Sequence, residues 1–359
     1  MTAASASYPA PHLEIRQRLP RVTMLHQVLS DGTLWGTAGR AILRGNVAGW
    51  QAVGRFPFAA PRDLLGFTRP TARATRADKC NVFVNTRGRV LGIRASVVYA
   101  VQPLGKTTPL FRIQGDCVLH GGICEDQDGW TYFGEYFMNP ERRPVRIWRL
   151  SPELDAWETA LELPAGSIRH VHGVYRDPFD PDALWATVGD YQGECFFYRT
   201  TDHFRTVQRL GDGTQVWRAV RLFFTSDHIC WLTDSQIEQN HACRIRRSGG
   251  QVQVGQPVDA SSWYGTQTSD GLYVAFTTVE PGPGIHRNES LVMASEDAFH
   301  WQETHAFRKD FWRPMKVFKY GVISCPSGPM NSQELYLSGE GLAGLDGVSA
   351  CVRIVREAS

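Results

Sequence analysis

Imidazole, carboxylate and phenol side chains gather around short apolar segments in the middle of this sequence. His170 and His172 lie in RHVHGVYRD, and Asp190 with Tyr191 ends the run ALWATVGDY. Side chains of these types donate or accept protons, which is what the cleavage of a glycosidic bond requires. The sequence therefore predicts an acid–base site, for which the catalytic candidates are His170, His172, Glu135, Asp190, Tyr191 and Asp234.

Two reactions are open to such a set. Hydrolysis needs one protonated carboxylic acid and a second carboxyl group as base or nucleophile, and Glu135, Asp190 and Asp234 offer such pairs. Elimination from a uronic acid needs a base, a cation that neutralises the sugar carboxylate and an acid for the leaving oxygen. The candidate base is His170 or His172, and the candidate acid is Tyr191 or Tyr264. The candidate cations are Arg218 and Arg313.

Aromatic and basic residues stand where other apolar segments begin. Flat rings stack on the apolar faces of sugars, and forked guanidinium groups hold hydroxyls or a carboxylate. The substrate-binding candidates are His120, Trp217, Arg218, Tyr264, Trp312 and Arg313. The alternative is a non-catalytic protein that binds a glycan or a protein partner.

No single stretch has a recognised metal-ligand spacing, so we expect no cofactor. The one combination that we consider for a divalent metal is His120, His172 and a carboxylate such as Asp190.

The apolar segments that carry these residues recur along the chain. A first series reads TLWGT, RVLGIR, WTYFGEY, ALWATVGDY, ICWLTDS, LYVAFTT and VISCPSG, and each member is followed by a second run such as AILRG, VRIWRL or ELYLSG. We assign these two series to the second and third strands of a repeated sheet, with a further strand on each side. Four short strands that return about every 48 residues are typical of a β-propeller.

We therefore expect a single all-β domain over residues 1–359, a seven-bladed β-propeller, with six blades as the alternative. A Pro- and Arg-rich stretch from Pro61 to Ala77 interrupts the first two repeats. The ring closes either through pairing of HLEIRQRL with the last blade or through CVRIVRE alone. We expect the N-terminal segment to contribute.

The strand directions in a blade predict which side chains meet. Successive turns of an antiparallel blade open on opposite faces, so the starts of first strands and the ends of second strands share one face. His170 precedes a first strand and Asp190 follows a second strand, and the other candidates hold equivalent places in neighbouring repeats. We expect all of them at one mouth of the central channel.

Two segments between third and fourth strands carry a family motif. TTDHFRTV (Thr200 to Val207) and SEDAFHW (Ser295 to Trp301) resemble the Asp-box, S/T-x-D-x-G-x-T-W, of the sialidase-like (BNR) propellers, with Phe204 and Phe299 in place of the glycine. The resemblance implies a propeller in which Asp202 and Asp297 hold turns on the face opposite the active site. Sialidase activity does not carry over, because the arginine triad and the R-I-P motif of that family are not matched.

Composition excludes several classes of partner. The 38 basic and 36 acidic residues leave a net charge of +2, too small to predict nucleic-acid binding. The chain begins without a signal peptide and has no apolar run long enough to span a membrane, so we expect a cytoplasmic protein with no membrane contact. We expect a monomer that acts on a small molecule or oligosaccharide, and its eight cysteines, none in a C-x-x-C pair, are expected to be reduced and buried.

Overall fold

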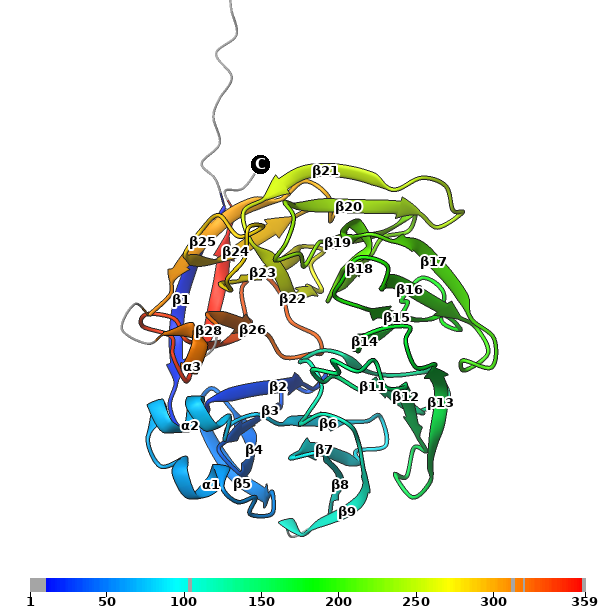
Figure 1. The fold of residues 1–359 in the computed structure, drawn as a ribbon. Helices are drawn as coiled ribbons and strands as arrows, with labels where there is room; N and C mark the ends of the chain where they lie inside the picture. The colour runs from blue at the N-terminus through cyan, green and yellow to red at the C-terminus, as the bar shows by residue number, and fades with distance from the viewer. Residues whose placement is uncertain (1–10, 103–104, 311–313, 319, 357–359) are drawn as a thin grey trace, which may run out of the picture.

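A computed structural model describes residues 11–102, 105–310, 314–318 and 320–356. In these residues, seven antiparallel sheets of four strands each are arranged around a central axis, like the blades of a propeller (Figure 1). The predicted seven-bladed all-β fold is confirmed, and the six-bladed alternative is wrong.

The strands of each blade follow one another from the axis outward. Blade one consists of β2 (Met24–Val28), β3 (Leu34–Ala38), β4 (Ala41–Asn46) and β5 (Gly49–Arg55). Blade two consists of β6 (Asn81–Val84), β7 (Val90–Arg94), β8 (Val97–Val101) and β9 (Thr107–Arg112). Blade three consists of β10 (Ile123–Glu125), β11 (Thr131–Gly134), β12 (Val145–Leu150) and β13 (Trp157–Leu163). Blade four consists of β14 (Val171–Arg176), β15 (Leu184–Val188), β16 (Cys195–Thr200) and β17 (Gln208–Gly213). Blade five consists of β18 (Leu222–Phe224), β19 (His228–Leu232), β20 (Asn240–Arg246) and β21 (Gln253–Val258). Blade six consists of β22 (Ser261–Gln267), β23 (Tyr273–Thr278), β24 (Glu289–Ser295) and β25 (Gln302–Arg308).

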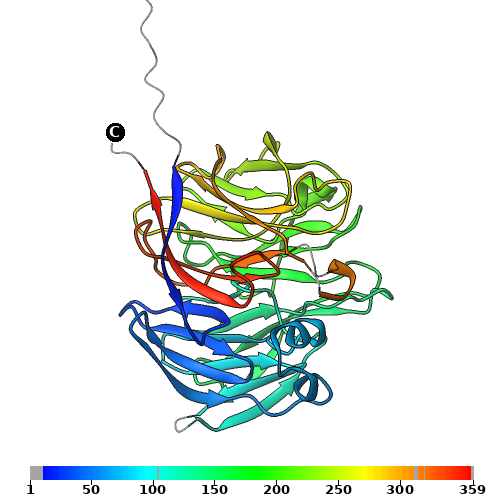
Figure 2. The same cartoon turned by 90° about the vertical axis from the view of Figure 1, so that its left-hand side faces the viewer.

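Blade seven joins the two ends of the described chain. Its order from the axis is β26 (Val322–Ser324), β27 (Leu335–Glu340), β28 (Val348–Val355) and the N-terminal β1 (His12–Leu19), and β1 and β28 run side by side in Figure 2. Their antiparallel register extends from His12 opposite Val355 to Leu19 opposite Ser349. The expected N-terminal contribution is confirmed. The predicted order of strands in this blade was wrong. VISCPSG was expected to contain the second strand from the axis, but it contains the innermost strand, β26, and β1 supplies the outermost strand.

The hydrophobic core lies between neighbouring blades. All five residues of β15 are buried, whereas β17 at the rim has mostly exposed or half-buried side chains. One apolar cluster, for example, joins Ile147 of blade three to Val174 and Leu184 of blade four. The inner strands are therefore mostly buried along their length, because each is covered on both faces by an adjacent blade.

Short helices break the β pattern at the insertions. The stretch from Pro61 to Ala77 contains α1 (Arg62–Leu65) and α2 (Arg69–Thr75), and later segments contain η2 (Gln215–Trp217) and α3 (Met315–Phe318). The Thr68 side chain caps α2, and the fully buried Arg73 in that helix pairs with Asp310 at 2.7 Å. Helices of one or two turns are too short to give a helical period in the sequence. No helix in the described ranges is long and apolar enough to cross a membrane.

The two Asp-box segments form the turns expected of them. Asp202 Oδ1 accepts a hydrogen bond from the Thr206 backbone nitrogen at 2.9 Å, and its Oδ2 accepts one from the Thr206 hydroxyl at 2.7 Å. Phe204, at the position of the motif glycine, has a φ of 67°, a left-handed conformation that is unusual for a bulky residue. Its buried ring lies 6.0 Å from that of Tyr132, so packing between blades stabilises the turn.

All eight cysteines are free thiols; seven of them are buried, and Cys124 is half-buried. The expectation of reduced, buried cysteines therefore agrees with the structure.

Candidate functional site

The end of each second strand carries one charged residue, repeated around the channel. From blade one to blade seven these residues are Arg40, Arg94, Glu135, Asp190, Asp234, Glu280 and Glu340. The two arginines pair with Asp63 of α1, and Glu340 pairs with Lys79 at 3.0 Å. The neighbouring blades four, five and six therefore bring three carboxyl groups to one side of the mouth.

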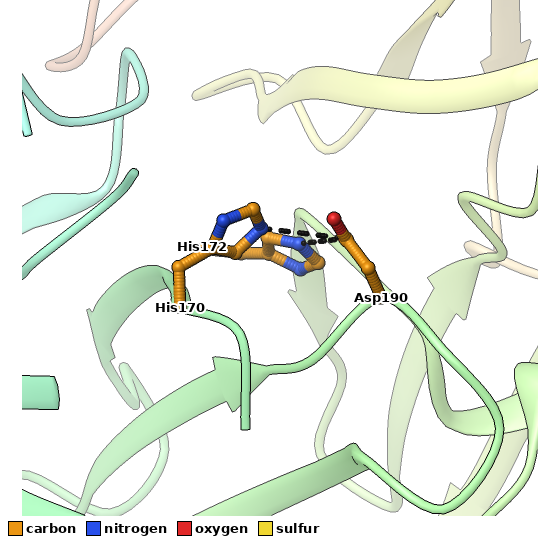
Figure 3. A group of neighbouring side chains, drawn as sticks. All are labelled: His170, His172 and Asp190. Carbon is orange, nitrogen blue, oxygen red and sulfur yellow. Dashed lines mark hydrogen bonds and ion pairs between the residues drawn. The ribbon is translucent and has the colours of Figure 1, made fainter. Parts of the chain in front are cut away.

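The first of these carboxyl groups, Asp190, faces two imidazoles (Figure 3). Its Oδ1 lies 3.0 Å from His172 Nε2 and 3.3 Å from His170 Nε2. Each ring contacts a backbone carbonyl through Nδ1, at 2.9 Å from Phe137 for His170 and from Ala219 for His172. Because only a protonated nitrogen can donate to a carbonyl oxygen, Nδ1 of each ring carries a proton. His172 Nε2 also forms a hydrogen bond to Asp190 Oδ1, and because a carboxylate only accepts, this nitrogen carries a proton as well. His170 Nε2 has no hydrogen-bond partner in the described part of the chain.

Two guanidinium groups hold the same carboxylate. Arg169 Nη1 lies 2.5 Å from Asp190 Oδ2, and Arg218 Nη2 lies 3.3 Å from Asp190 Oδ1. Arg218 also donates to the Asp190 backbone oxygen at 3.1 Å. Burial alone would raise the pKa of Asp190, but electrostatic interactions with His170 and Arg218 hold it well below its usual value.

Arg218 connects Asp190 to a second carboxyl group, Asp234. Its Nε lies 3.3 Å from Asp234 Oδ2. Asp234 Oδ1 and Glu280 Oε1 are buried and have no hydrogen-bond partner in the described part of the chain. Burial raises the pKa of Asp234 to about 7 despite the charge of Arg218, and burial also raises the pKa of Glu280. The mouth thus combines one ionised carboxylate with a neighbouring group that retains its proton near neutral pH.

Ligand atoms of His170, His172 and Asp190 converge closely enough to hold a metal ion, since they lie within 4.8 Å of one another. A second such group, Asp126, Asp128 and His203, lies at the opposite ends of the blades. In the first group, Arg169 and Arg218 already balance the Asp190 charge, so ion pairs account for the arrangement without a metal. The combination of His120 with His172 and Asp190 is not among the groups that converge in the described residues.

Three predicted residues lie outside this cluster. Glu135 is fully buried and accepts hydrogen bonds from the Gln114 and Arg146 backbone nitrogens, at 2.9 and 3.1 Å. Tyr191 is 43% exposed, and the Arg169 guanidinium carbon lies over its ring, 5.6 Å from the ring centre of Tyr191. Trp217 is buried, with its ring stacked 5.5 Å from that of Trp231. The contacts of Glu135 and Trp217 are those of packing residues.

Two other substrate-binding candidates lie deeper in the channel. His120 and Tyr264 are buried with ring centres 5.9 Å apart, and both line a cavity on the axis. Burial lowers the pKa of His120 to about 3, so this imidazole is uncharged at neutral pH. Trp312 and Arg313 lie outside the described residues.

Sequence reasoning brought together His170, His172, Asp190, Arg218 and Asp234 but left out Arg169, and it placed Tyr136 beside Glu135 at the mouth without assigning it a role. Arg169 directly precedes His170, and this adjacency is the signal that could have identified it. The Tyr136 ring centre lies 4.2 Å from that of His170. Burial and the nearby Asp190 raise the pKa of its phenol.

No family model and no curated protein matches this chain. Among solved structures, YCF48 bound to D1 peptide is similar over 100% of both chains, with 9% identity and a TM-score of 0.54. Sqt1 of Saccharomyces cerevisiae matches 98% of this chain and 100% of its own, with 9% identity and a TM-score of 0.51. The gluconolactonase XC5397 of Xanthomonas campestris covers 77% of this chain and 94% of its own, at 14% identity and a TM-score of 0.42. The similarities to YCF48 and Sqt1 support the β-propeller fold alone, and the narrower sialidase-like relationship stays a prediction.

Proposed function

We propose that this protein cleaves a uronic-acid-containing glycan by elimination, with His170 as base and Asp234 as acid. The observation that carries the proposal is the continuous chain of contacts from His170 through Asp190 and Arg218 to Asp234. This chain of contacts supports a proton acceptor and a proton donor on adjacent blades at one mouth of the channel. The substrate is an oligosaccharide, and we propose that the protein acts as a cytoplasmic monomer.

Elimination is favoured over hydrolysis by the state of the carboxyl groups. Hydrolysis needs one carboxylate that is free to act as base or nucleophile. Asp190 is bound by Arg169, Arg218 and two imidazoles, and Glu135 is held by backbone donors. An imidazole is therefore the better placed base, and Asp190 serves to orient it.

The base in this scheme is His170 Nε2. The Nδ1 contact with Phe137 leaves Nε2 to accept the proton from the sugar carbon next to the uronate carboxylate. The resulting imidazolium lies 3.3 Å from Asp190, whose charge stabilises it. Arg169, whose side chain is 11% exposed, is the cation nearest the surface and would bind the uronate carboxylate.

The acid is Asp234, which keeps its proton near neutral pH because it is buried next to Glu280. As the carbon–oxygen bond of the leaving sugar breaks, Asp234 protonates the departing oxygen. The electron pair of the broken C–H bond forms the double bond of the product, so no oxidant or reductant is needed.

The test is incubation with polygalacturonate, alginate and a glycosaminoglycan. We expect one of them to yield unsaturated uronic acid ends, detected by ultraviolet absorbance. His170→Gln is expected to lower kcat by about 100-fold, the usual loss on removal of a general base. The matched control is His12→Gln in β1, an exposed histidine away from the mouth, which should leave kcat unchanged.

Other products would contradict the proposal. New reducing ends without the unsaturated product would indicate hydrolysis. Saturable glycan binding without turnover in the wild-type protein would support the non-catalytic alternative instead.

A further inference from the structure

A cavity of about 140 Å³ lies on the axis of the propeller, apart from the acid–base cluster. Its wall comes from the innermost strands or adjoining segments of blades three to seven and includes His120, Tyr175, Arg221, Tyr264, Gln267 and Ser327. His170 directly precedes β14, in which Tyr175 follows His172, and Gln267 is the last residue of β22. The cavity therefore extends further down the channel than the two histidines.

One wall residue, Arg221, is a cation without a counter-ion among the residues that the structure describes. Its guanidinium lies over the Tyr175 ring, 5.2 Å from the ring centre. The Nε atom is buried and has no hydrogen-bond partner in this part of the chain. In the described ranges, Arg221 forms no ion pair, and no aspartate or glutamate lines this cavity.

Other arginines inside the molecule are neutralised. Arg218, three residues earlier, contacts both Asp190 and Asp234. Arg73 and Arg94 are fully buried and pair with Asp310 and Asp63. A half-buried guanidinium among aromatic side chains loses hydration, and an ion pair or hydrogen bonds must compensate for that loss. For Arg221, the described protein supplies only the face of Tyr175.

We propose that this cavity binds a small oxyanion, a carboxylate or a phosphate, through Arg221. A forked guanidinium matches both kinds of group. A cavity near 150 Å³ accommodates a molecule about the size of benzene, so the ligand is a compact acid and not an oligosaccharide. The uncharged His120 and Gln267 can form hydrogen bonds to it but add no second positive charge. The inference is independent of the proposed elimination at the mouth.

Calorimetric titration of the full-length protein with sodium acetate, inorganic phosphate and acetamide tests this site. Acetamide has the shape of acetate without its charge. We expect saturable binding of acetate, phosphate or both, and none of acetamide. Binding of acetate alone would identify a carboxylate site, and binding of phosphate alone a phosphate site.

Variants then locate the site. Arg221→Gln should weaken anion binding at least about tenfold, the usual effect of losing a hydrogen bond to a charged group. Arg246→Gln, which removes an exposed arginine of the same blade, should leave affinity within about twofold. If Arg221→Gln does not fold, Arg221→Lys keeps the charge but loses the fork and is expected to bind more weakly than wild type.

Three results would overturn the proposal. The first is an absence of saturable binding of acetate and phosphate at about 10 mM, where even weak sites fill. The second is equal binding of acetate and acetamide. The third is unchanged affinity in folded Arg221→Gln or Arg221→Lys.

Discussion

At the scale of the residue, Arg218 contacts two carboxyl groups at the channel mouth that differ in pKa. Its guanidinium contacts Asp190 and Asp234, yet the pKa of Asp190 is well below its usual value and that of Asp234 is raised to about 7. The difference arises because Asp190 has further cationic partners, whereas Asp234 is buried near Glu280. Two carboxyl groups with separated pKa values provide distinct protonation states at one pH.

The pH dependence of activity follows from the raised pKa of Asp234. If Asp234 is the acid, kcat falls as the pH rises through about 7, because the proton is lost. Asp234→Asn cannot donate a proton in the same way, so we expect kcat to fall about 100-fold and the alkaline decrease to disappear. The pH profiles of kcat for both proteins test this. Asp227→Asn, at an exposed position of the same blade, should retain the wild-type profile, and an alkaline limb that persists in Asp234→Asn would assign the titration to another group.

At the scale of the element, the turns after the innermost strands join neighbouring blades. Asp177 follows β14 in blade four and is completely buried. Its oxygens lie 2.7 and 2.9 Å from the two Nη atoms of Arg247 in blade five, and one of them accepts from Trp185 Nε1 at 3.2 Å. One carboxylate therefore holds a turn and an interface between blades together.

Loss of this carboxylate should destabilise the ring. Asp177→Asn leaves the partly exposed Arg247 without its charged partner, and the loss of hydrogen bonds to a charged group costs about 1.5–3 kcal/mol. The free energy of unfolding in urea measures the effect. Asp180 in the same turn pairs with Arg199 at the surface, and Asp180→Asn should cost no more than about 1 kcal/mol. Equal losses in the two variants would contradict a special role for the buried pair.

At the scale of the whole molecule, closure of the ring depends on a strand from the opposite end of the chain. β1 pairs with β28 in blade seven, so the blade is complete only when both ends of the chain are in place. A propeller gains stability from closure because it leaves few unpaired strand edges.

Removal of this strand tests the closure. Deletion of residues 12–19 exposes the edge of β28, so we expect a lower midpoint of thermal unfolding and concentration-dependent aggregation. Circular dichroism and size-exclusion chromatography report these two effects. Arg16→Gln, an exposed change within β1 that keeps its backbone pairing, is the control and should change neither. An unchanged midpoint without β1 would mean that three strands suffice for blade seven.

The sequence alone predicted an all-β propeller of seven blades, with six as the alternative, and placed the candidate site residues at the ends of strands. The reason is that strand periodicity and turn residues are local, and they recur at each repeat from TLWGT to VISCPSG. Asp190 and His172 could thus be placed on one face before any contact was known.

Only the tertiary structure decided which of these charged groups interact. Glu135 and Asp190 hold equivalent places in their blades, yet backbone donors hold Glu135 while Asp190 meets two imidazoles and two guanidinium groups. Arg221 likewise stands in the sequence as a single charged residue within an apolar segment, and only the assembled propeller shows that it lines a cavity on the axis. Partners, burial and therefore pKa values come from residues on other blades, and their distances are set by packing between sheets that a local pattern does not encode.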